Sequence, residues 1–323
     1  MPTMSSPSLP FALPSSLSGK TYLVTGANTG IGLSTAQALS TCGARVYIGS
    51  RSLEKANTAI ETIRAETPNA DLHILQMDLL DLSSVVQAAK EFKSKETKLH
   101  GLVNNAGIMA TPFAKSPTDG FEAQWQTNYV SQWLLTWHLL DTLVSTAREE
   151  GSAGSVRIVN VTSNGHKFAP KMGIDFDDLS LEKSGGIWSR YGQSKLANIL
   201  HAKQLNKLYG ATQSENKEAA APAIWTTAVH PGSIDTNLNK QTALPGFFYT
   251  VLKTLGVYSQ PSEGAYNSLF AVASPNFRAG DSGQYFVPGQ KREKPSKVAQ
   301  DMGLADKLWE WTKGELGRRN LLK

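Results

Sequence analysis

The sequence predicts an α/β protein in which one doubly wound parallel sheet is covered by helices on both faces. Short apolar runs alternate with longer amphipathic segments along most of the 323 residues, and the first apolar run ends in a glycine-rich turn. Such alternation is typical of parallel strands joined by helical crossovers. With 40% hydrophobic and 18% charged residues, the chain has the composition of a globular protein and is long enough for a sizeable core.

The expected elements follow one another along the chain. Strands are expected at 21–26, 44–49, 72–77, 99–105, 155–161, 223–230 and 283–287. Helices are expected at 29–41, 52–66, 82–97, 119–148, 188–205, 236–258, 262–273 and 296–314. Because no internal repeat or long low-complexity linker interrupts this series, residues 18–323 are expected to form a single domain. Residues 1–17 contain four prolines and are expected to be a flexible N-terminal segment, with Phe11 and Leu13 as candidates for contact with the domain.

Composition and charge argue against several classes of protein. The formal net charge is +5, but the basic residues are scattered, and clusters such as Lys291-Arg292-Glu293-Lys294 are typical of solvated surface, so no nucleic acid is expected as a partner. No apolar run approaches the ~18 residues of a membrane span, and no secretory signal is recognisable. A cytoplasmic protein is therefore expected. The single cysteine, Cys42, excludes an internal disulfide, and His73, His100 and His201 have no acid or cysteine partners at ligand spacing, so no metal site is predicted.

A glycine-rich turn between the first strand and the first helix predicts a dinucleotide site. In "VTGANTGIG" the three glycines serve a tight turn, close approach of the backbone to a pyrophosphate, and close packing of helix on strand. The N-terminus of the following helix offers free N–H groups and a positive dipole to the phosphates. The residues expected to hold the nucleotide here are Gly26, Asn28, Thr29, Gly30, Ile31 and Gly32.

The end of the second strand indicates which nucleotide is bound. An NAD site is expected to place an acid there for the ribose 2′-hydroxyl. This chain instead reads "YIGSRSLEK", with Arg51 just past the strand. Because a guanidinium can pair with a 2′-phosphate, NADP(H) is predicted in preference to NAD. The alternative is an arginine that is merely solvated at the start of a helix.

Four motifs together resemble the short-chain dehydrogenase/reductase family. They occur in the order and roughly at the spacing of that family: "TGANTGIG", "NNAG" at 104–107, Ser163, and "YGQSK" at 191–195. Finer likenesses, among them "SNGHKF" followed by "DFDDL" and then "VHPGSIDT", resemble its retinol-dehydrogenase-like and WW-domain-oxidoreductase-like branch. The resemblance covers about residues 18–290. It implies a Rossmann-type, NADP-binding oxidoreductase that acts on CH–OH groups.

Tyr191 and Lys195 stand one turn apart on a predicted helix. A tyrosine with its ordinary pKa of about 10 is a poor acid near neutrality, and a nearby ammonium favours tyrosinate and lowers that pKa. Tyr191 is therefore a candidate for acid-base catalysis, although the spacing alone also suits a surface pair. The resemblance implies that Tyr191 exchanges a proton with the substrate oxygen. The resemblance implies that Lys195 also holds the nicotinamide ribose, so both residues are expected to touch the cofactor.

Ser163 and Asn128 complete the predicted catalytic group. Ser163 follows the strand at 155–161, where its hydroxyl can hydrogen-bond the substrate oxygen; its neighbour Thr162 is a competing candidate, and the resemblance selects Ser163. Asn128 lies inside a long predicted helix, where asparagine is not favoured. The resemblance implies that Asn128 holds a water linking the lysine to bulk solvent, and a kink in the helix is compatible with that role.

The resemblance also implies further contacts with the nucleotide. Asp78 matches an acid that touches the adenine, with Asp81 as an alternative helix cap. The turn after the fourth strand and the turn after the sixth are expected to contact the cofactor as well. The residues expected there are Asn104, Ala106, Gly107, Pro231, Gly232 and Thr236.

The sequence says less about the substrate. Ser163 and Tyr191 are 28 residues apart, and the intervening segment is expected to form a loop beside the pocket. The segment 238–259 is rich in Leu, Phe, Tyr and Val and is expected either to cover a lipophilic ketone or alcohol or to pack against the body or another subunit. By analogy, a ketoreductase of secondary metabolism is favoured. Monomer and homodimer are both open, and the resemblance points to the helices at 119–148 and 188–205, which commonly pair across subunits in the family. A non-catalytic NADP-binding sensor or scaffold, and an epimerase or isomerase, are the alternatives.

Overall fold

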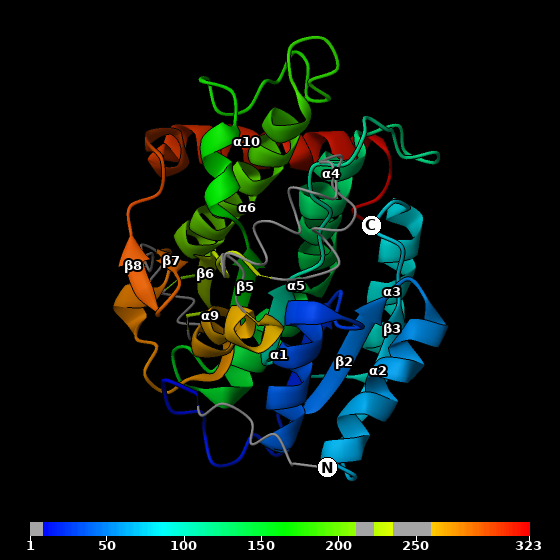
Figure 1. The fold of residues 1–323 in the computed structure, drawn as a ribbon, viewed down its shortest axis with the longest axis vertical. Helices are drawn as coiled ribbons and strands as arrows, with labels where there is room; N and C mark the ends of the chain where they lie inside the picture. Colours follow the sequence, from blue (N-terminus) through cyan, green and yellow to red (C-terminus); the bar gives the residue numbers. More distant parts are fainter. Residues whose placement is uncertain (1–8, 211–222, 235–259) are drawn as a thin grey trace.

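The computed structural model describes residues 9–210, 223–234 and 260–323, and its centre is one eight-stranded sheet (Figure 1). The strand order is β3-β2-β1-β4-β5-β6-β7-β8. Strands β1 to β7 run parallel, and β8 is antiparallel to β7. The strands are β1 (Thr21–Thr25), β2 (Arg45–Ser50), β3 (Leu72–Gln76), β4 (Gly101–Asn104), β5 (Arg157–Val161), β6 (Trp225–Val229), β7 (Tyr285–Val287) and β8 (Lys291–Glu293).

The order of the strands reverses between β1 and β4. From β1 the chain moves outward through β2 to β3, then returns to β4 and moves the other way through β5, β6 and β7. In sheets of this kind the crevice at the carboxyl ends of the strands, where the order reverses, is where ligands bind. The predicted doubly wound α/β sheet is confirmed, and its switch point lies where Thr25 and Asn104 end their strands.

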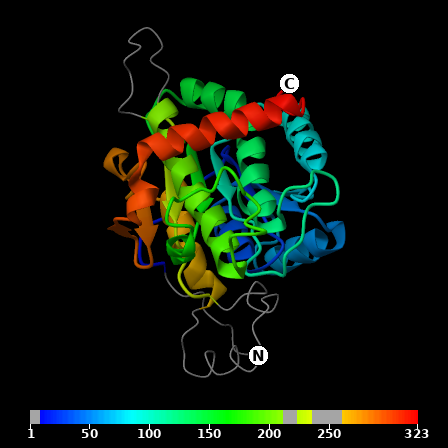
Figure 2. The same ribbon diagram turned by 90° about the horizontal axis from the view of Figure 1, so that it is seen from above.

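Helices α1, α2 and α9 pack on one face of the sheet, and α3, α5 and α6 pack on the other, each group with its own hydrophobic core. Helices α1 and α9 lie side by side (Figure 1). Helix α10 packs across the outer side of the layer that α3, α5 and α6 form (Figure 2). The helices are α1 (Gly30–Thr41), α2 (Leu53–Glu66), α3 (Leu82–Lys95), α4 (Ala123–Trp125), η1 (Gln126–Val130), α5 (Ser131–Glu150), η2 (Asn164–Phe168), α6 (Ile187–Tyr209), α9 (Pro261–Ala273), η3 (Ala279–Asp281), η4 (Lys297–Gln300) and α10 (Met302–Arg318).

The described residues depart from the expected elements at the predicted helix 119–148 and at β8. The predicted helix 119–148 begins with the single turn α4, passes through the π-helical turn η1 and only then becomes α5. The strand β8 is not predicted, because all three of its residues are charged and exposed and it carries no apolar signal. Charged residues on an edge strand discourage pairing with another chain. The predicted helix 236–258 lies outside the described residues.

The segment before β1 makes contacts with the face that α9 covers. Phe11 packs edge-on against Tyr266 and Phe270, with ring centroids 6.3 and 5.5 Å apart. The Ser274 hydroxyl donates to the carbonyl of Ala12 at 2.8 Å. Residues from Leu9 onward therefore add to the core on this face.

Candidate active site

A cleft of about 530 Å³ opens at the carboxyl ends of the strands where their order reverses. It brings together most of the residues that the sequence predicts for the site. Asn104 and Asn128 do not line it, and Thr236 lies outside the described residues. The predicted residues that line it are Gly26, Asn28, Thr29, Gly30, Ile31, Gly32, Arg51, Asp78, Ala106, Gly107, Ser163, Tyr191, Lys195, Pro231 and Gly232.

The glycine turn is shaped for close approach of a ligand. Gly26 and Gly30 have φ of 66° and 57°, a conformation that glycine adopts without strain. A Cβ on Gly32 would lie 2.5 Å from the carbonyl oxygen of Gly26, so only glycine fits there. Helix α1 starts at Gly30, and no side chain caps its first N–H groups. The turn therefore offers a cradle of backbone donors that fits a pyrophosphate.

The ends of β2 and β3 form the other part of the nucleotide half of the cleft. Arg51 lies here with its side chain 71% exposed and its guanidinium 3.9 Å from the Asp78 carboxylate. Lys55 lines the same part of the cleft, and Ser52, which also lines it, caps α2 by accepting from the Lys55 amide. Sequence reasoning missed Lys55. Its place in the first turn of the helix that follows the arginine is the signal that could have identified it.

Asn104 ends β4, Asn105 follows it, and their side chains point in different directions. Asn104 is 3% exposed, and its amide nitrogen donates to Thr136 Oγ1 at 3.0 Å and to Asn160 Oδ1 at 2.8 Å. Asn105 lines the cleft, and its amide nitrogen donates to the carbonyl of Thr25 at 2.8 Å. Because side chains alternate along a strand, only one of two neighbours can face a given side. The structure thus brings Asn105, rather than the side chain of Asn104, to the site.

Tyr191 and Lys195 enter the cleft from the first turns of α6, and both are buried, at 5% and 4% exposure. Burial raises the pKa of Tyr191 to about 12, opposed by its hydrogen bond with Ser163. Burial lowers the pKa of Lys195 to about 8. The sequence predicts instead that the lysine lowers the tyrosine pKa. In the structure, desolvation disfavours both charged forms and is the largest cause of both pKa shifts, and the lysine Nζ is 5.8 Å from the centre of the tyrosine ring.

Gly107 lets Lys195 and Asn128 approach the same point. A Cβ on Gly107 would lie 2.9 Å from Asn128 Oδ1 and 3.2 Å from Lys195 Nζ. Lys195 Nζ donates to the carbonyl of Val161 at 3.1 Å. The Asn128 side chain accepts from the Ile108 amide at 2.8 Å and donates to the Ile108 carbonyl at 2.9 Å. Asn128 therefore lies behind Ile108, which forms part of the cleft wall, and it holds that part of the wall beside the lysine.

Ser163 lies two residues beyond the end of β5 and caps the helical turn η2. Its hydroxyl accepts from the Gly165 amide at 3.0 Å, and it lies close enough to Tyr191 for a hydrogen bond. The hydroxyl of Thr162 donates to the carbonyl of Lys195 at 2.6 Å, so that side chain is committed to α6. Of the two candidates, Ser163 is the one whose hydroxyl is turned toward the tyrosine.

Two histidines lie close to this turn. His166 is fully buried; its Nε2 accepts from the Ser296 amide at 3.1 Å, so its Nδ1 carries the proton and donates to the carbonyl of Ser163 at 2.7 Å. His230 lines the cleft, and burial lowers its pKa to about 4, which keeps it neutral. Sequence reasoning assigned His230 no role, because a single histidine between a strand and a Pro-Gly turn carries no signal of its own.

Comparison with known proteins gives a consistent result. Residues 20–174 match the family model described as short chain dehydrogenase. The chain is 68% identical to the short-chain dehydrogenase/reductase drtF of Aspergillus calidoustus, over 98% of this chain and 99% of that protein. It is 35% identical to retinol dehydrogenase 12 of Mus musculus, over 90% of this chain and 84% of that protein.

Solved structures of other proteins have the same fold. An uncharacterized protein from Mycobacterium paratuberculosis superposes with a TM-score of 0.70 and 30% identity, over 94% of this chain and 95% of that one. The NADP complex of Pseudomonas aeruginosa RhlG superposes with a TM-score of 0.63, over 91% of this chain and 100% of that one; at 23% identity it shows the fold alone.

The fold, the cleft and these likenesses define the class of the protein. The chain belongs to the short-chain dehydrogenase/reductase family. It is an oxidoreductase with a Rossmann-type fold, and the family uses NAD(P)(H). No helix among residues 9–210, 223–234 and 260–323 is long and apolar enough to cross a bilayer.

Proposed function

We propose that this chain is an NADP(H)-dependent carbonyl reductase or alcohol dehydrogenase that acts on a lipophilic ketone or alcohol. One observation carries the proposal: Ser163, Tyr191 and Lys195 line the same cleft as the glycine turn. A hydrogen-bonding hydroxyl, a proton donor and a cation beside a dinucleotide cradle are the groups that carbonyl reduction requires.

Each of the three side chains has its own task in carbonyl reduction. When bound, the nucleotide supplies hydride to the carbonyl carbon. Tyr191 donates its phenolic proton to the carbonyl oxygen, and its pKa of about 12 keeps the proton in place until that oxygen becomes basic. Ser163 donates a hydrogen bond to the same oxygen and stabilises the charge that builds on it. Lys195 favours the tyrosinate that remains.

Asn128 is assigned a supporting task in the same reaction. Its Oδ1 and the Lys195 ammonium lie on the same side of Gly107, within 2.9 and 3.2 Å of the place that a Cβ would occupy there. This proximity supports the role of Asn128 in holding a water that returns a proton to the lysine.

Two cations support NADP(H) in preference to NAD(H). Arg51 and Lys55 line the end of the cleft at which β2 and β3 stop, and the residues that end β2 are Gly49 and Ser50, neither of them an acid. The contact between Arg51 and Asp78 is long and exposed, so it holds the guanidinium only weakly. A 2′-phosphate placed here would meet two positive charges.

Apolar side chains beside Tyr191 support a lipophilic substrate. The Trp188 ring lies edge-on to the Tyr191 ring, with centroids 6.3 Å apart, and the Phe168 ring is 6.0 Å from that of Trp188. Phe168 is 57% exposed, and Trp188 is half-buried. Clustered exposed apolar side chains are typical of binding surfaces. The segment 238–259, predicted as a cover for the pocket, lies outside the described residues.

Reduction of apolar ketones by the purified chain tests the proposal. We expect NADPH consumption with bicyclic probes such as β-tetralone and acetonaphthone, matched by alcohol product. The change Tyr191→Phe removes the proton donor and should lower kcat by about 10²- to 10⁴-fold, with the Kd for NADPH unchanged within about twofold. Tyr209→Phe, on the same helix and away from the cleft, is the matched control.

The outcomes separate the candidate functions. Turnover near the parental rate in the Tyr191→Phe protein would remove the assigned role. NADPH binding without reduction of any ketone would favour a nucleotide-binding sensor or scaffold. A product formed without net consumption of NADPH would favour an epimerase or isomerase.

A further inference from the structure

A buried ion pair lies at the start of α6, one residue before Tyr191. Arg190 Nε is 3.7 Å from Glu122 Oε1, and the two side chains are only 9% and 1% exposed. Glu122 also caps α4, since its Oε2 accepts from the Trp125 amide at 2.7 Å. A neutral capping residue would serve that purpose without the cost of burying two charges, a cost that their attraction often fails to repay. The pair therefore requires an explanation beyond the helix cap.

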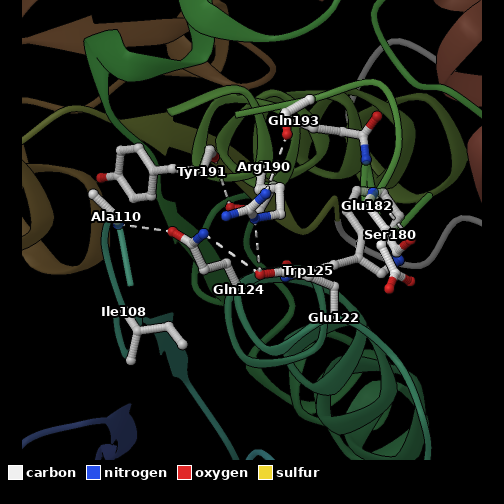
Figure 3. Close-up of polar contacts among 12 residues, drawn as sticks. Ile108, Ala110, Glu122, Gln124, Trp125, Ser180, Glu182, Arg190, Tyr191 and Gln193 are labelled. Carbon is white, nitrogen blue, oxygen red and sulfur yellow. Dashed lines mark hydrogen bonds and ion pairs between the residues drawn. The ribbon is translucent and has the colours of Figure 1, made fainter. Parts of the chain in front are cut away.

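Gln124 connects this pair to the wall of the cleft. Its Oε1 accepts from the Ala110 amide at 2.8 Å, and its Nε2 lies 3.5 Å from Glu122 Oε1. The dashed lines in Figure 3 follow this path from Ala110 through Gln124 to Glu122 and Arg190. Ala110 has φ of 49°, a left-handed conformation that costs energy for a residue with a Cβ. The hydrogen bond that the Ala110 amide donates to Gln124 helps to hold it there.

The wall itself is fixed at two points by one short helical stretch. Ile108 and Met109 line the cleft, and Asn128 holds Ile108 through both its amide and its carbonyl. Gln124 and Asn128 are four residues apart, on either side of the change from α4 to the π-helical turn η1. Departures from α-helical geometry of this kind often occur at functional sites.

We propose that Glu122 and Arg190, acting through Gln124, are positioning residues that set the spacing between the Ile108–Ala110 wall and the Tyr191 ring. This inference rests on the proposed function, because that spacing is where a substrate carbonyl would have to fit. The ion pair joins the start of the helix that carries the proton donor to the segment that carries the opposite wall. Misplacement of a reacting group by about 1 Å can lower a rate by about a hundredfold.

A double-mutant cycle on the ion pair tests the proposal. The changes are Arg190→Met, Glu122→Gln and both together; the double change leaves no unpaired buried charge, and Glu122→Gln keeps an acceptor for the helix cap. Gln124→Met removes both the acceptor for the Ala110 amide and the amide nitrogen beside Glu122, and it leaves the ion pair itself in place. Glu182→Gln, which breaks the exposed ion pair with Lys115, is the control.

Three measurements are needed for each protein: hydrogen–deuterium exchange of the peptide spanning residues 106–114, the Kd for NADPH, and kcat and KM for β-tetralone. We expect the single changes and Gln124→Met to speed exchange in that peptide and to lower kcat/KM for β-tetralone by about 10- to 100-fold. The Kd for NADPH should stay within about twofold, and the double change should cost less than the sum of the single ones. Arg190→Lys should restore part of the loss.

Two results would overturn the inference. One is parental exchange and parental ketone kinetics in the Arg190→Met and Gln124→Met proteins. The other is a general rise in exchange with equal losses of NADPH affinity and turnover, which is what a merely structural role would give. Failure of the proposed function would be visible separately, as full activity of Tyr191→Phe or inactivity of the parent, and the exchange measurement would still decide whether the pair fixes the wall.

Discussion

Burial governs the two ionisable side chains at the centre of the cleft. Desolvation penalises tyrosinate and ammonium alike, so it raises the pKa of Tyr191 to about 12 and lowers that of Lys195 to about 8. The tyrosine therefore keeps its proton throughout the physiological range. The lysine instead loses its proton at a pH well below that of an ordinary lysine.

The lowered pKa of Lys195 predicts a pH dependence. Since the group is a base, it is charged below its pKa of about 8 and neutral above it. If the ammonium holds the nucleotide, kcat/KM for NADPH should fall as the pH rises through about 8, rather than near the ordinary lysine value of about 10.4. Measurement of initial rates between about pH 7 and pH 10 checks this. Lys195→Met should lack the inflection, and a flat profile in the parent would contradict the prediction.

Arg51 predicts nucleotide preference. Charge-assisted hydrogen bonds to a phosphate contribute about 1.5–3 kcal/mol, which corresponds to roughly 10- to 100-fold in affinity. Arg51→Ala should therefore weaken NADPH binding by that factor and leave NADH binding nearly unchanged, as measured by fluorescence titration. Lys55→Ala should have a smaller effect of the same kind.

The control for this prediction is Arg64→Ala, since Arg64 is exposed on α2 and does not line the cleft. It removes the same net charge without touching the nucleotide. Equal losses of NADPH and NADH affinity in the Arg51→Ala protein would show that the guanidinium serves the fold and not the 2′-phosphate.

At the scale of elements, the apolar runs predict β1 to β7 because buried strands are rich in apolar residues. Most of these strands are largely buried, and β3 still buries Leu72 and Leu75. β8 has no such signal, because its pairing with β7 depends on backbone hydrogen bonds between exposed charged residues. The π-helical turn η1 is also not evident from the sequence, because one extra residue in a turn changes the spacing of the apolar residues too little to be recognised. The sequence could not predict either feature.

The candidate site likewise contains some residues that the sequence predicts and others that it does not. Gly26, Ser163 and Tyr191 follow from motifs in which backbone geometry or chemistry restricts the residue type. The contribution of Lys55 depends on where the first turn of α2 lies, and that of Arg190 and Glu122 depends on two segments meeting in space. Contacts between segments of this kind have no local pattern, so they become visible only in the fold.

At the scale of the whole molecule, α10 covers part of α5 and α6 within the same chain. Every residue of α6 from Arg190 to Ala202 is buried within one chain, as is most of α5. Trp309 of α10 packs on the rings of Trp133 and Trp137, with centroids 5.0 and 6.2 Å apart. Little surface of α5 and α6 is therefore free for the pairing across subunits that the family resemblance suggests.

We accordingly predict that the chain does not form a dimer through α5 and α6. Light scattering after size-exclusion chromatography should give the mass of one chain, 34.9 kDa. Trp309→Ala would leave a gap between α10 and α5 and should lower the free energy of unfolding by about 3–5 kcal/mol. A stable dimer weakened by changes on α5 or α6 would contradict the prediction.

The contact between His166 and Ser296 has a consequence for the order in which the protein is completed. The ring that holds the carbonyl of Ser163 receives its second hydrogen bond from an amide 130 residues further along the chain. The hydroxyl of Tyr129, next to Asn128, likewise meets Thr312, 183 residues later. On a growing chain, Ser163 and Asn128 are synthesised long before the residues that support them. We therefore expect the reacting groups to reach their final arrangement only after the last helix has been synthesised and docked.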